Sequence, residues 1–313
     1  MDLMNFVRLA DPVLAQGDLK LLRDKAELCA ALEPARREGR TIGLVPTMGA
    51  LHEGHLSLLR AARAECDVVV MSLFVNPTQF GEGEDLDRYP RDEQRDLRLA
   101  AGAGVDFLYA PSADSVYPDG FSTQVEVEGE LTGALDGDPG RRGREHFRGV
   151  TTVVAKLFNS VGPDIAYFGQ KDAQQAAVIR RMAADLDFPV RIEVLPTVRE
   201  ADGLAMSSRN AYLSPEDRER ATALSRALRA VGETARAGSL ADGLEHGRRV
   251  LDEADIEAEY LEARDAERLT PAVELNGRPI LVAVAARVGD ARLIDNVLIR
   301  PSDPTSISSD HES

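Results

Sequence analysis

Residues 44–60, LVPTMGALHEGHLSLLR, decide the fold. A short apolar run ends at Pro46, a turn containing glycine follows, and an amphipathic stretch begins at the H-x-G-H pattern of His52, Gly54 and His55. A strand that leads into a helix leaves free backbone N–H groups and the positive end of the helix dipole at the turn, and both attract phosphate. Imidazoles can also donate hydrogen bonds to phosphate oxygens. The stretch therefore predicts a strand, a phosphate-binding turn and a helix, with two ordinary surface histidines as the alternative.

Length, composition and charge limit the classes to which the chain can belong. Its 313 residues suffice for one large domain or two moderate ones. No apolar run approaches the ~20 residues that span a bilayer, and the N-terminus lacks the basic region of a signal peptide. Two cysteines are too few for a disulfide framework, so we expect a cytoplasmic protein. Because the net charge is −16, we expect no nucleic-acid partner, and we expect no membrane partner either.

Strand and helix patterns alternate through the first two thirds of the chain. Strands are predicted at 41–45, 68–75, 105–109, 164–168 and 190–195. Helices are predicted at 21–37, 54–64, 92–101 and 150–161, with one more ending at about 185. Residues 1–19 are interpreted as an extension and 111–144 as an excursion with short strands. The alternation is typical of a Rossmann-like α/β domain with a parallel sheet, which we place at 1–197.

Polar turns follow three of these strands, at 46–55, 76–81 and 169–172. Ligands of parallel sheets bind outside the carboxyl ends of the strands, so these turns are expected to meet at one site. Residues 81–90, GEGEDLDRYP, are rich in glycine and acids and are expected to form a mobile loop over that site.

The pattern changes beyond residue 197. A polar turn at 204–210 precedes Ser214-Pro215-Glu216, which is a typical helix start. Two helices and three short strands, at 256–263, 279–287 and 292–299, predict a smaller α+β lid domain at 198–301. Residues 302–313 contain five serines and are predicted to be a disordered tail.

Several side chains near these turns suit phosphate or a small acid. An ammonium, two hydroxyls and a guanidinium could hold phosphates, at Lys171, Ser207, Ser208 and Arg209. The neutral amides of Gln79 and Gln175 could hold a hydroxylated carboxylic acid. The acids Asp85, Asp87, Asp92 and Asp96 could bind Mg²⁺. Each group taken alone could equally be a solvated surface residue.

The combination is more specific than any single group. The segments LVPTMGALHEGH, FVNPTQFG, YFGQKDAQQ and DGLAMSSRN, in this order and spacing, closely resemble the pantothenate synthetase (pantoate–β-alanine ligase) family over residues 21–300. That family is similar in fold to cytidylyltransferases and class I aminoacyl-tRNA synthetases. The resemblance implies condensation of (R)-pantoate with β-alanine through a pantoyl adenylate, releasing AMP and pyrophosphate. It also implies ATP as co-substrate, Mg²⁺ as cofactor and a homodimer.

The resemblance further implies the residues of the site. The catalytic residues would be His52, His55, Lys171, Ser207, Ser208 and Arg209. Contacts with ATP would come from Met48, Gly49, Ala50, Leu51, His52, Glu53, Gly54, His55, Gly169, Gln170, Lys171, Asp172, Val198, Met206, Ser207, Ser208 and Arg209. The substrates would contact Pro46, Asn76, Gln79 and Gln175, and the metal would be bound by Asp96.

The chain departs from the family pattern at three positions. Gln170 stands where a glutamate is usual, and Ala173 replaces the usual aromatic residue before the paired glutamines. Gly143 stands where family members often have an arginine, three residues before the histidine of HFRGV. Its neighbours Arg142 and Arg144 are both candidates for that role.

Three other functions share parts of the pattern. A tRNA synthetase should carry a basic surface and a K-M-S-K-S loop, whereas this chain is acidic and has Met206-Ser207-Ser208-Arg209. Another nucleotidylyltransferase would retain AMP in its product. A non-catalytic ATP-binding module would not require the full set of phosphate-binding residues.

Overall fold

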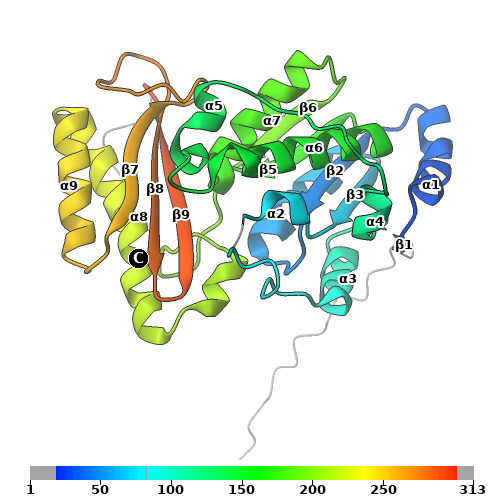
Figure 1. Ribbon diagram of the computed structural model, residues 1–313, viewed down its shortest axis with the longest axis horizontal. Coiled ribbons are helices and arrows are strands. Elements are labelled where there is room, and N and C mark those ends of the chain that lie inside the picture. The colour runs from blue at the N-terminus through cyan, green and yellow to red at the C-terminus, as the bar shows by residue number, and fades with distance from the viewer. Residues whose placement is uncertain (1–18, 82, 302–313) are drawn as a thin grey trace, which may run out of the picture.

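The computed structural model describes residues 19–81 and 83–301. Figure 1 shows two parts side by side. The larger part is a sheet with helices on both faces, and the smaller part is a narrow sheet with two helices on its outer side. The predicted tail, and all of the predicted extension except Leu19, lie outside the described residues.

The larger part is built on a six-stranded parallel sheet with the order β1-β4-β3-β2-β5-β6. Its strands are β1 (Lys20–Leu22), β2 (Ile42–Thr47), β3 (Val68–Leu73), β4 (Phe107–Tyr109), β5 (Ile165–Gly169) and β6 (Arg191–Leu195). The chain moves outward from β2 to β4 on one side and then returns to place β5 on the other side of β2. This reversal creates a crevice beyond the carboxyl ends of β2 and β5, where open α/β sheets bind ligands.

Helices bury both faces of this sheet. One face packs against α1 (Lys25–Arg37), α6 (Gly143–Val161) and α7 (Ala173–Asp185). The other packs against α2 (Glu53–Glu65) and α3 (Glu93–Gly102). The side chains of β3 alternate accordingly, with Val68 and Val70 in the first core and Val69 and Met71 in the second. Burial on both faces explains why these strands read as continuous apolar runs.

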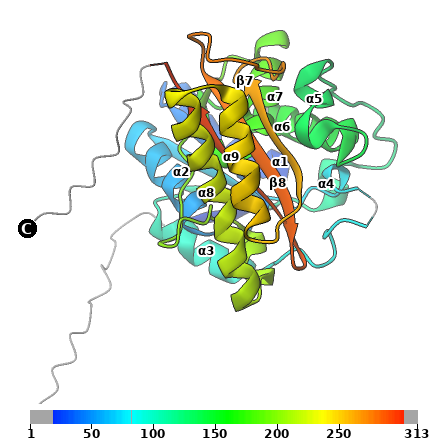
Figure 2. The same ribbon diagram turned by 90° about the vertical axis from the view of Figure 1, so that its left-hand side faces the viewer.

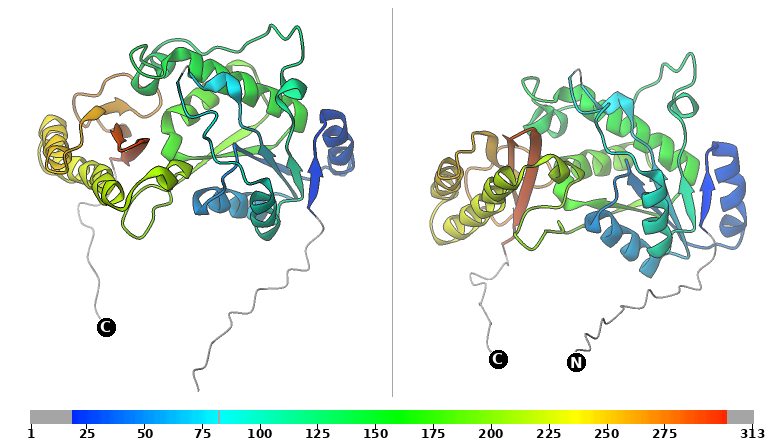
Figure 3. Two further views of the ribbon diagram at one scale, coloured as in Figure 1. Left: turned by 60° about the horizontal axis from the view of Figure 1, so that its bottom comes forward. Right: turned by 90° about the horizontal axis from the view of Figure 1, so that it is seen from below.

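The smaller part consists of α8 (Pro215–Ala237), α9 (Leu240–Asp252), β7 (Ala258–Asp265), β8 (Ile280–Val288) and β9 (Ala291–Ile299). The strands are antiparallel in the order β7-β8-β9. Figure 2 shows α8 and α9 lying across the outer face of this sheet, and Figure 3 shows the same layering from below. Val282 and Val284 pack toward these helices, whereas Leu281 and Ala283 share a core with Leu135 of the larger part.

Short helical turns complete the structure. They are η1 (Pro77–Gln79), α4 (Ala113–Val116), α5 (Glu130–Gly133), η2 (Leu135–Gly137), η3 (Gln170–Asp172) and η4 (Ser208–Tyr212). Two of these, η1 and η3, follow strands β3 and β5, and η4 leads into the smaller part. The turns therefore lie at the edge where the crevice was expected.

The predicted fold class, a Rossmann-like α/β domain followed by a smaller α+β part, is confirmed. The helix predicted to begin at residue 21 is wrong at its start, because residues 20–22 form the edge strand β1. Residues 111–144 hold the short helices α4 and α5, and no named strand lies among these described residues. The predicted domain boundary at 197/198, and the role of 198–301 as a lid, remain predictions.

Candidate active site

The turn after β2 is shaped by a buried carboxylate. Asp96 of α3 is 1% exposed, and its two oxygens accept hydrogen bonds from the backbone N–H groups of Ala50 and Leu51, at 2.9 and 2.8 Å. Gly49 has a φ of +88°, and a Cβ there would lie 2.9 Å from the Asp96 carboxylate. Glycine at position 49 therefore lets the chain fold closely around Asp96.

His52 and His55 are held by the helix that they begin. His52 is the N-cap of α2, and its Nδ1 accepts a hydrogen bond from the Gly54 N–H at 3.2 Å. His55 Nδ1 accepts a longer one, 3.4 Å, from the His52 N–H. The two ring centroids are 4.1 Å apart. Gly54 makes room for this arrangement, since a Cβ there would lie 2.9 Å from the His52 ring.

Both imidazoles are neutral around pH 7. Burial, followed by the charge of Lys171, lowers the pKa of His52 to about 4. Burial, followed by the neighbouring His52, lowers the pKa of His55 to about 3. Because each Nδ1 accepts a backbone hydrogen bond, the single proton of each neutral ring is on Nε2. Each ring can therefore donate an Nε2–H hydrogen bond without carrying a charge.

The turn after β3 presents Gln79. The side chain of Asn76, 1% exposed, caps η1 and donates a hydrogen bond of 3.1 Å to the Gln79 Oε1. A second hydrogen bond from Asn76 reaches the Gly149 carbonyl of α6. Gln79 Nε2 donates one hydrogen bond to the Met48 sulfur at 3.2 Å, which leaves its second hydrogen for a ligand in the cleft. Asn76 thus positions Gln79, although it also lines the cleft.

The turn after β5 carries Lys171, and helix α7, which follows it, carries two glutamines with different roles. The Lys171 ammonium lies 3.7 Å from the Asp172 carboxylate, and both residues line the cleft. Gln174 is buried, and its amide bonds the backbone of the 131–136 segment. Gln175 also lines the cleft and is only partly buried. Gln170 points to Asn296 of β9 at 3.1 Å.

The turn that leads into the smaller part completes the phosphate-binding set. Ser207 caps η4, and the Ser208 hydroxyl donates to the phenol oxygen of Tyr89 at 3.3 Å. Arg209 makes two hydrogen bonds to Asp85 of the 81–90 loop, at 2.9 and 2.7 Å. Burial works to raise the pKa of the Asp85 carboxyl, but the hydrogen bonds and charge of Arg209 outweigh it and hold that pKa below its usual value.

One cleft collects most of the predicted residues. It lies between the carboxyl ends of β2 and β5 and the inner face of β8 and β9. The predicted residues that line it are Pro46, Met48, His52, Gly54, His55, Asn76, Gln79, Gly169, Lys171, Asp172, Gln175, Val198, Met206, Ser207, Ser208 and Arg209. The predicted ATP contacts that do not line it are Gly49, Ala50, Leu51, Glu53 and Gln170. For the residues that line the cleft as for those that do not, the predicted contacts with ATP and substrates remain predictions.

Near the start of α6, the structure places one of the two arginine candidates in the cleft and adds Glu84 and His146, which the sequence analysis did not assign. Arg142 lines the cleft and makes two hydrogen bonds to Glu84, at 3.0 and 2.6 Å. It also donates to His146 Nε2 at 3.1 Å, because a guanidinium can only donate. His146 Nδ1 then donates to the Gln79 carbonyl at 2.7 Å. Between the two arginines beside Gly143, Arg142 lines the cleft and Arg144 does not.

Thr197 was also missed. Its hydroxyl is buried in the cleft and has no hydrogen-bond partner among the described residues. A buried hydroxyl without a partner costs free energy unless a ligand or water satisfies it. Thr197 lies next to Val198, a predicted ATP contact, so it marks this wall of the cleft as a place for a polar ligand. A threonine carries no sequence pattern that would have revealed this.

The predicted metal ligand Asp96 supports the turn. Both of its oxygens are engaged with backbone N–H groups, and the side chain is buried. In residues 19–81 and 83–301 no three His, Cys, Asp or Glu side chains gather as a set of metal ligands. Metal binding by Asp96 therefore remains a prediction without structural support.

Comparison with known proteins identifies the family. A family model described as "Pantoate-beta-alanine ligase" matches residues 20–298. The chain belongs to the pantoate–β-alanine ligase family. It is 53% identical over 290 residues to the pantothenate synthetase of Moorella thermoacetica, and the match covers 91% of this chain and 100% of the relative. The family and the enzyme class predicted from the sequence, an ATP-dependent ligase, are thereby confirmed.

Solved members of the pantoate–β-alanine ligase family have the same fold. The pantothenate synthetase of Thermus thermophilus is 49% identical, with a TM-score of 0.84, 90% of this chain covered and 100% of that chain. The ligase of Francisella tularensis, solved with beta-gamma ATP and beta-alanine, is 33% identical, with a TM-score of 0.76, 92% of this chain covered and 100% of that chain. No helix in the described part of the chain is long and apolar enough to cross a membrane.

Proposed function

We propose that this cleft joins (R)-pantoate to β-alanine through a pantoyl adenylate, with ATP as the co-substrate. The observation that carries the proposal is the meeting of two kinds of group in one cleft. Neutral Nε2–H donors and cations suit a triphosphate, and the amides of Gln79 and Gln175 suit a small hydroxy acid. Membership of the ligase family supports the same function, as does the Francisella tularensis relative solved with beta-gamma ATP and beta-alanine.

In the first step a carboxylate oxygen of pantoate attacks the α-phosphorus of ATP, and the bond to pyrophosphate breaks. Negative charge grows on the phosphate oxygens as this happens, so donors already fixed in place stabilise the transition state. Lys171 and Arg209 supply positive charge. His52 and His55 supply hydrogen bonds from Nε2, and Ser207 and Ser208 can supply hydroxyl donors. The pantoate carboxylate must remain an unprotonated nucleophile, which the uncharged Gln79 amide permits.

In the second step the amine of β-alanine attacks the acyl carbon, and AMP leaves as the amide bond forms and the amine loses a proton. This step depends chiefly on holding two reactants in contact, for which a rigid pocket is more important than a strong base. Gln79 is well suited to this role. Its Oε1 is held by Asn76 and its backbone carbonyl by His146, so the direction of its Nε2 is fixed.

The mixed anhydride reacts readily with water, so the site must exclude water while it waits for the amine. The described part of the 81–90 loop is placed to do this, because Glu84 bonds Arg142, which lines the cleft, and Tyr89 of the loop lines the cleft itself. We propose that this loop and the 198–301 lid domain close over the adenylate.

Magnesium fits this site as an ion carried by the nucleotide. Mg²⁺ commonly binds substrate phosphates, several waters and only one or two carboxylates. Asp172 lines the cleft beside Lys171 with its side chain 46% exposed, so it could provide such a carboxylate. The metal would offset the charge of the departing pyrophosphate. The homodimer is a proposal that rests on the family resemblance, and a light-scattering mass measurement would test it. The cytoplasmic location is a proposal that rests on the presence of only two cysteines.

Product analysis tests the proposed function. The protein, ATP, Mg²⁺, (R)-pantoate and β-alanine should yield pantothenate, AMP and pyrophosphate in equal amounts. A nucleotidylyltransferase would instead retain AMP in its product. A non-catalytic ATP-binding module would form no pantothenate, AMP or pyrophosphate. Either outcome would contradict the proposal.

A further inference from the structure

Both polar atoms of the Asn296 side chain, on β9, form hydrogen bonds with the turn that carries Lys171. Its Nδ2 donates two hydrogen bonds to consecutive carbonyl oxygens, those of Gln170 at 2.9 Å and Lys171 at 2.8 Å. Its Oδ1 accepts a third from the Gln170 side chain at 3.1 Å. Asn296 is 5% exposed, and it reaches η3 from the smaller part of the molecule, 125 residues further along the chain.

These bonds fix the orientation of a turn that has little local support. Within the described residues, η3 has no side-chain cap at its N-terminus. The Lys171 side chain leaves the middle of this three-residue turn and lines the cleft. Two hydrogen bonds to neighbouring carbonyls hold both peptide planes, and these planes determine the direction in which the Lys171 side chain leaves the backbone.

Asn296 is itself held by its neighbour. The Asp295 Oδ1 accepts the backbone N–H of Asn296 at 2.7 Å, and the carboxylate is 4% exposed. The same carboxylate makes two hydrogen bonds to Arg199, at 2.7 and 3.0 Å. Arg199 pairs with Ala205 in the segment that leads to Ser207. One short piece of β9 is therefore linked to both phosphate-binding turns.

We propose that Asn296 is a positioning residue for the adenylation step. It sets the Lys171 ammonium toward the nucleotide phosphates and makes that position depend on the docking of β9. The inference rests on the proposed function, because it takes a triphosphate as the partner of Lys171. A primary amide is required, since it has two donors for the two carbonyls. An aspartate has none, and its charge would be repelled by both carbonyl oxygens.

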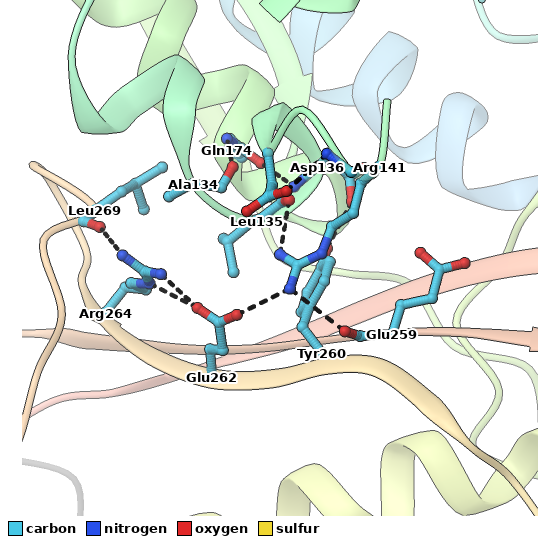
Figure 4. A network of polar contacts seen from close by, with 12 residues as sticks. Ala134, Leu135, Asp136, Arg141, Gln174, Glu259, Tyr260, Glu262, Arg264 and Leu269 are labelled. Atoms are coloured by element: carbon cyan, nitrogen blue, oxygen red, sulfur yellow. Dashed lines mark hydrogen bonds and ion pairs between the residues drawn. The ribbon is translucent and has the colours of Figure 1, made fainter. Parts of the chain in front are cut away.

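A simple docking role is the alternative, but other contacts already join the two parts. Figure 4 shows part of a buried network in which the Tyr260 hydroxyl donates to Asp136 at 2.8 Å and Arg141 pairs with Glu262 at 3.2 Å. Arg292 of β9 pairs with Asp136 at 2.9 Å. An apolar cluster that includes Leu135 and Leu281 adds to this interface. Loss of the Asn296 bonds should therefore leave the parts docked and alter mainly the position of Lys171.

The test compares Asn296→Ala and Asn296→Asp with Glu262→Gln, a control that weakens docking away from Lys171. Pantoate-dependent exchange of labelled pyrophosphate into ATP is measured together with the melting temperature. Both Asn296 variants should lose about 10- to 10²-fold in kcat, the effect of misplacing a group by ~1 Å. The Michaelis constant for pantoate should change little. The melting temperature should fall, because buried carbonyls lose their partners and Asn296→Asp also buries a charge, but the loss of kcat should persist well below that temperature. Glu262→Gln should keep its exchange rate within about twofold.

A double variant decides whether Asn296 acts through Lys171. If it does, Lys171→Ala combined with Asn296→Ala should lose no more exchange activity than Lys171→Ala alone. Additive losses, or Asn296 variants with wild-type kcat and a lower melting temperature, would overturn the inference and leave a docking role. Failure of the wild-type protein to exchange pyrophosphate would instead overturn the proposed function, so the two failures are distinguishable.

Discussion

The two histidines and the three cations of the cleft are held in different ways. His52 and His55 lie on a turn built by one continuous segment, in which the Nδ1 of each ring accepts a hydrogen bond from the backbone of the same helix start. One contribution from a distant segment is that of Asp96, whose carboxylate accepts hydrogen bonds from two backbone N–H groups of the turn. These donors are complete once the parallel sheet has formed. They should have the same geometry with and without nucleotide.

The cations Arg142, Lys171 and Arg209 depend on partners far away in the sequence. The Arg142 and Arg209 side chains bond Glu84 and Asp85, respectively. For Lys171, Asn296 bonds the backbone carbonyl, whereas the ammonium lies near the adjacent Asp172. Two of the three partners are carboxylates of the 81–90 loop, so they occupy guanidinium groups of the kind that phosphate also binds. The neutral donors are therefore built by one local segment, whereas the positions of the charged groups depend on distant segments. For Arg209, a predicted ATP contact, we expect phosphate to replace the Asp85 carboxylate.

The largest effect should come from removing one member of each set. His55→Ala and Lys171→Ala should each lower the rate of adenylate formation at least ~10²-fold, because each loses a donor aimed at the phosphates. Rapid-quench measurement of pyrophosphate formation in the absence of β-alanine gives this rate. His246→Ala is the matched control, since His246 of α9 contacts Thr234 and does not line the cleft. Near-normal rates in either test variant would remove that residue from the mechanism.

A second prediction concerns the boundary between nucleotide and acid. Gln79→Glu replaces the free amide donor with a negative charge beside the pantoate carboxylate. Pantoate binding should weaken by ~1–3 kcal/mol, while ATP binding stays close to that of the wild type. Calorimetric titration with each ligand separately measures both. Unchanged pantoate affinity together with a large loss of ATP affinity would mean that Gln79 contacts the nucleotide and not pantoate.

If phosphate must displace the Asp85 carboxylate from Arg209, removing that carboxylate should improve the apparent affinity for ATP. Asp85→Asn weakens the hold of the loop on Arg209, so the Michaelis constant for ATP should fall by about threefold to tenfold. Asp87→Asn is the control, because Asp87 is an exposed acid of the same loop that does not line the cleft. A higher Michaelis constant in Asp85→Asn alone would mean that Asp85 keeps its bond to Arg209 when ATP is bound.

The smallest expected effect is the dependence of the protein's stability on pH. The folded protein keeps the pKa of His52 and His146 near 4 and that of His55 near 3, whereas an unfolded histidine has a pKa of about 6.5. As the pH falls below about 6.5, these histidines bind protons in the unfolded state but stay neutral in the folded state, so the free energy of unfolding declines. Between pH 7 and 6 the melting temperature should fall by a few degrees. His146→Gln should reduce that slope, and an unchanged slope would contradict the assignment of a neutral His146.

The sequence predicted best what one segment builds by itself. The His turn, the strands with buried runs such as 68–73, and the order of the polar turns all follow from local patterns. The edge strand β1 was missed because three residues carry no periodicity, and its pairing with β4 comes from the tertiary fold. Asn296 and Glu84 were missed because their partners are 125 and 58 residues away.

Gln170 is a residue whose predicted role depended on its position in a motif, whereas its actual contact is with a distant strand. Its place in a GxKD-like turn suggested a contact with ATP, but its side chain bonds Asn296 of β9. Residues next to each other in a motif can thus serve different parts of the molecule. Position in a turn can be predicted from the sequence, whereas the direction of a side chain depends on what packs against the turn.

The central claim is that the cleft activates pantoate as an adenylate before β-alanine takes part. The most direct measurement is the exchange of labelled pyrophosphate into ATP by the wild-type protein with Mg²⁺, with and without each substrate. We predict exchange that requires pantoate and proceeds in the absence of β-alanine. Exchange without pantoate, or exchange only when β-alanine is present, would contradict the account.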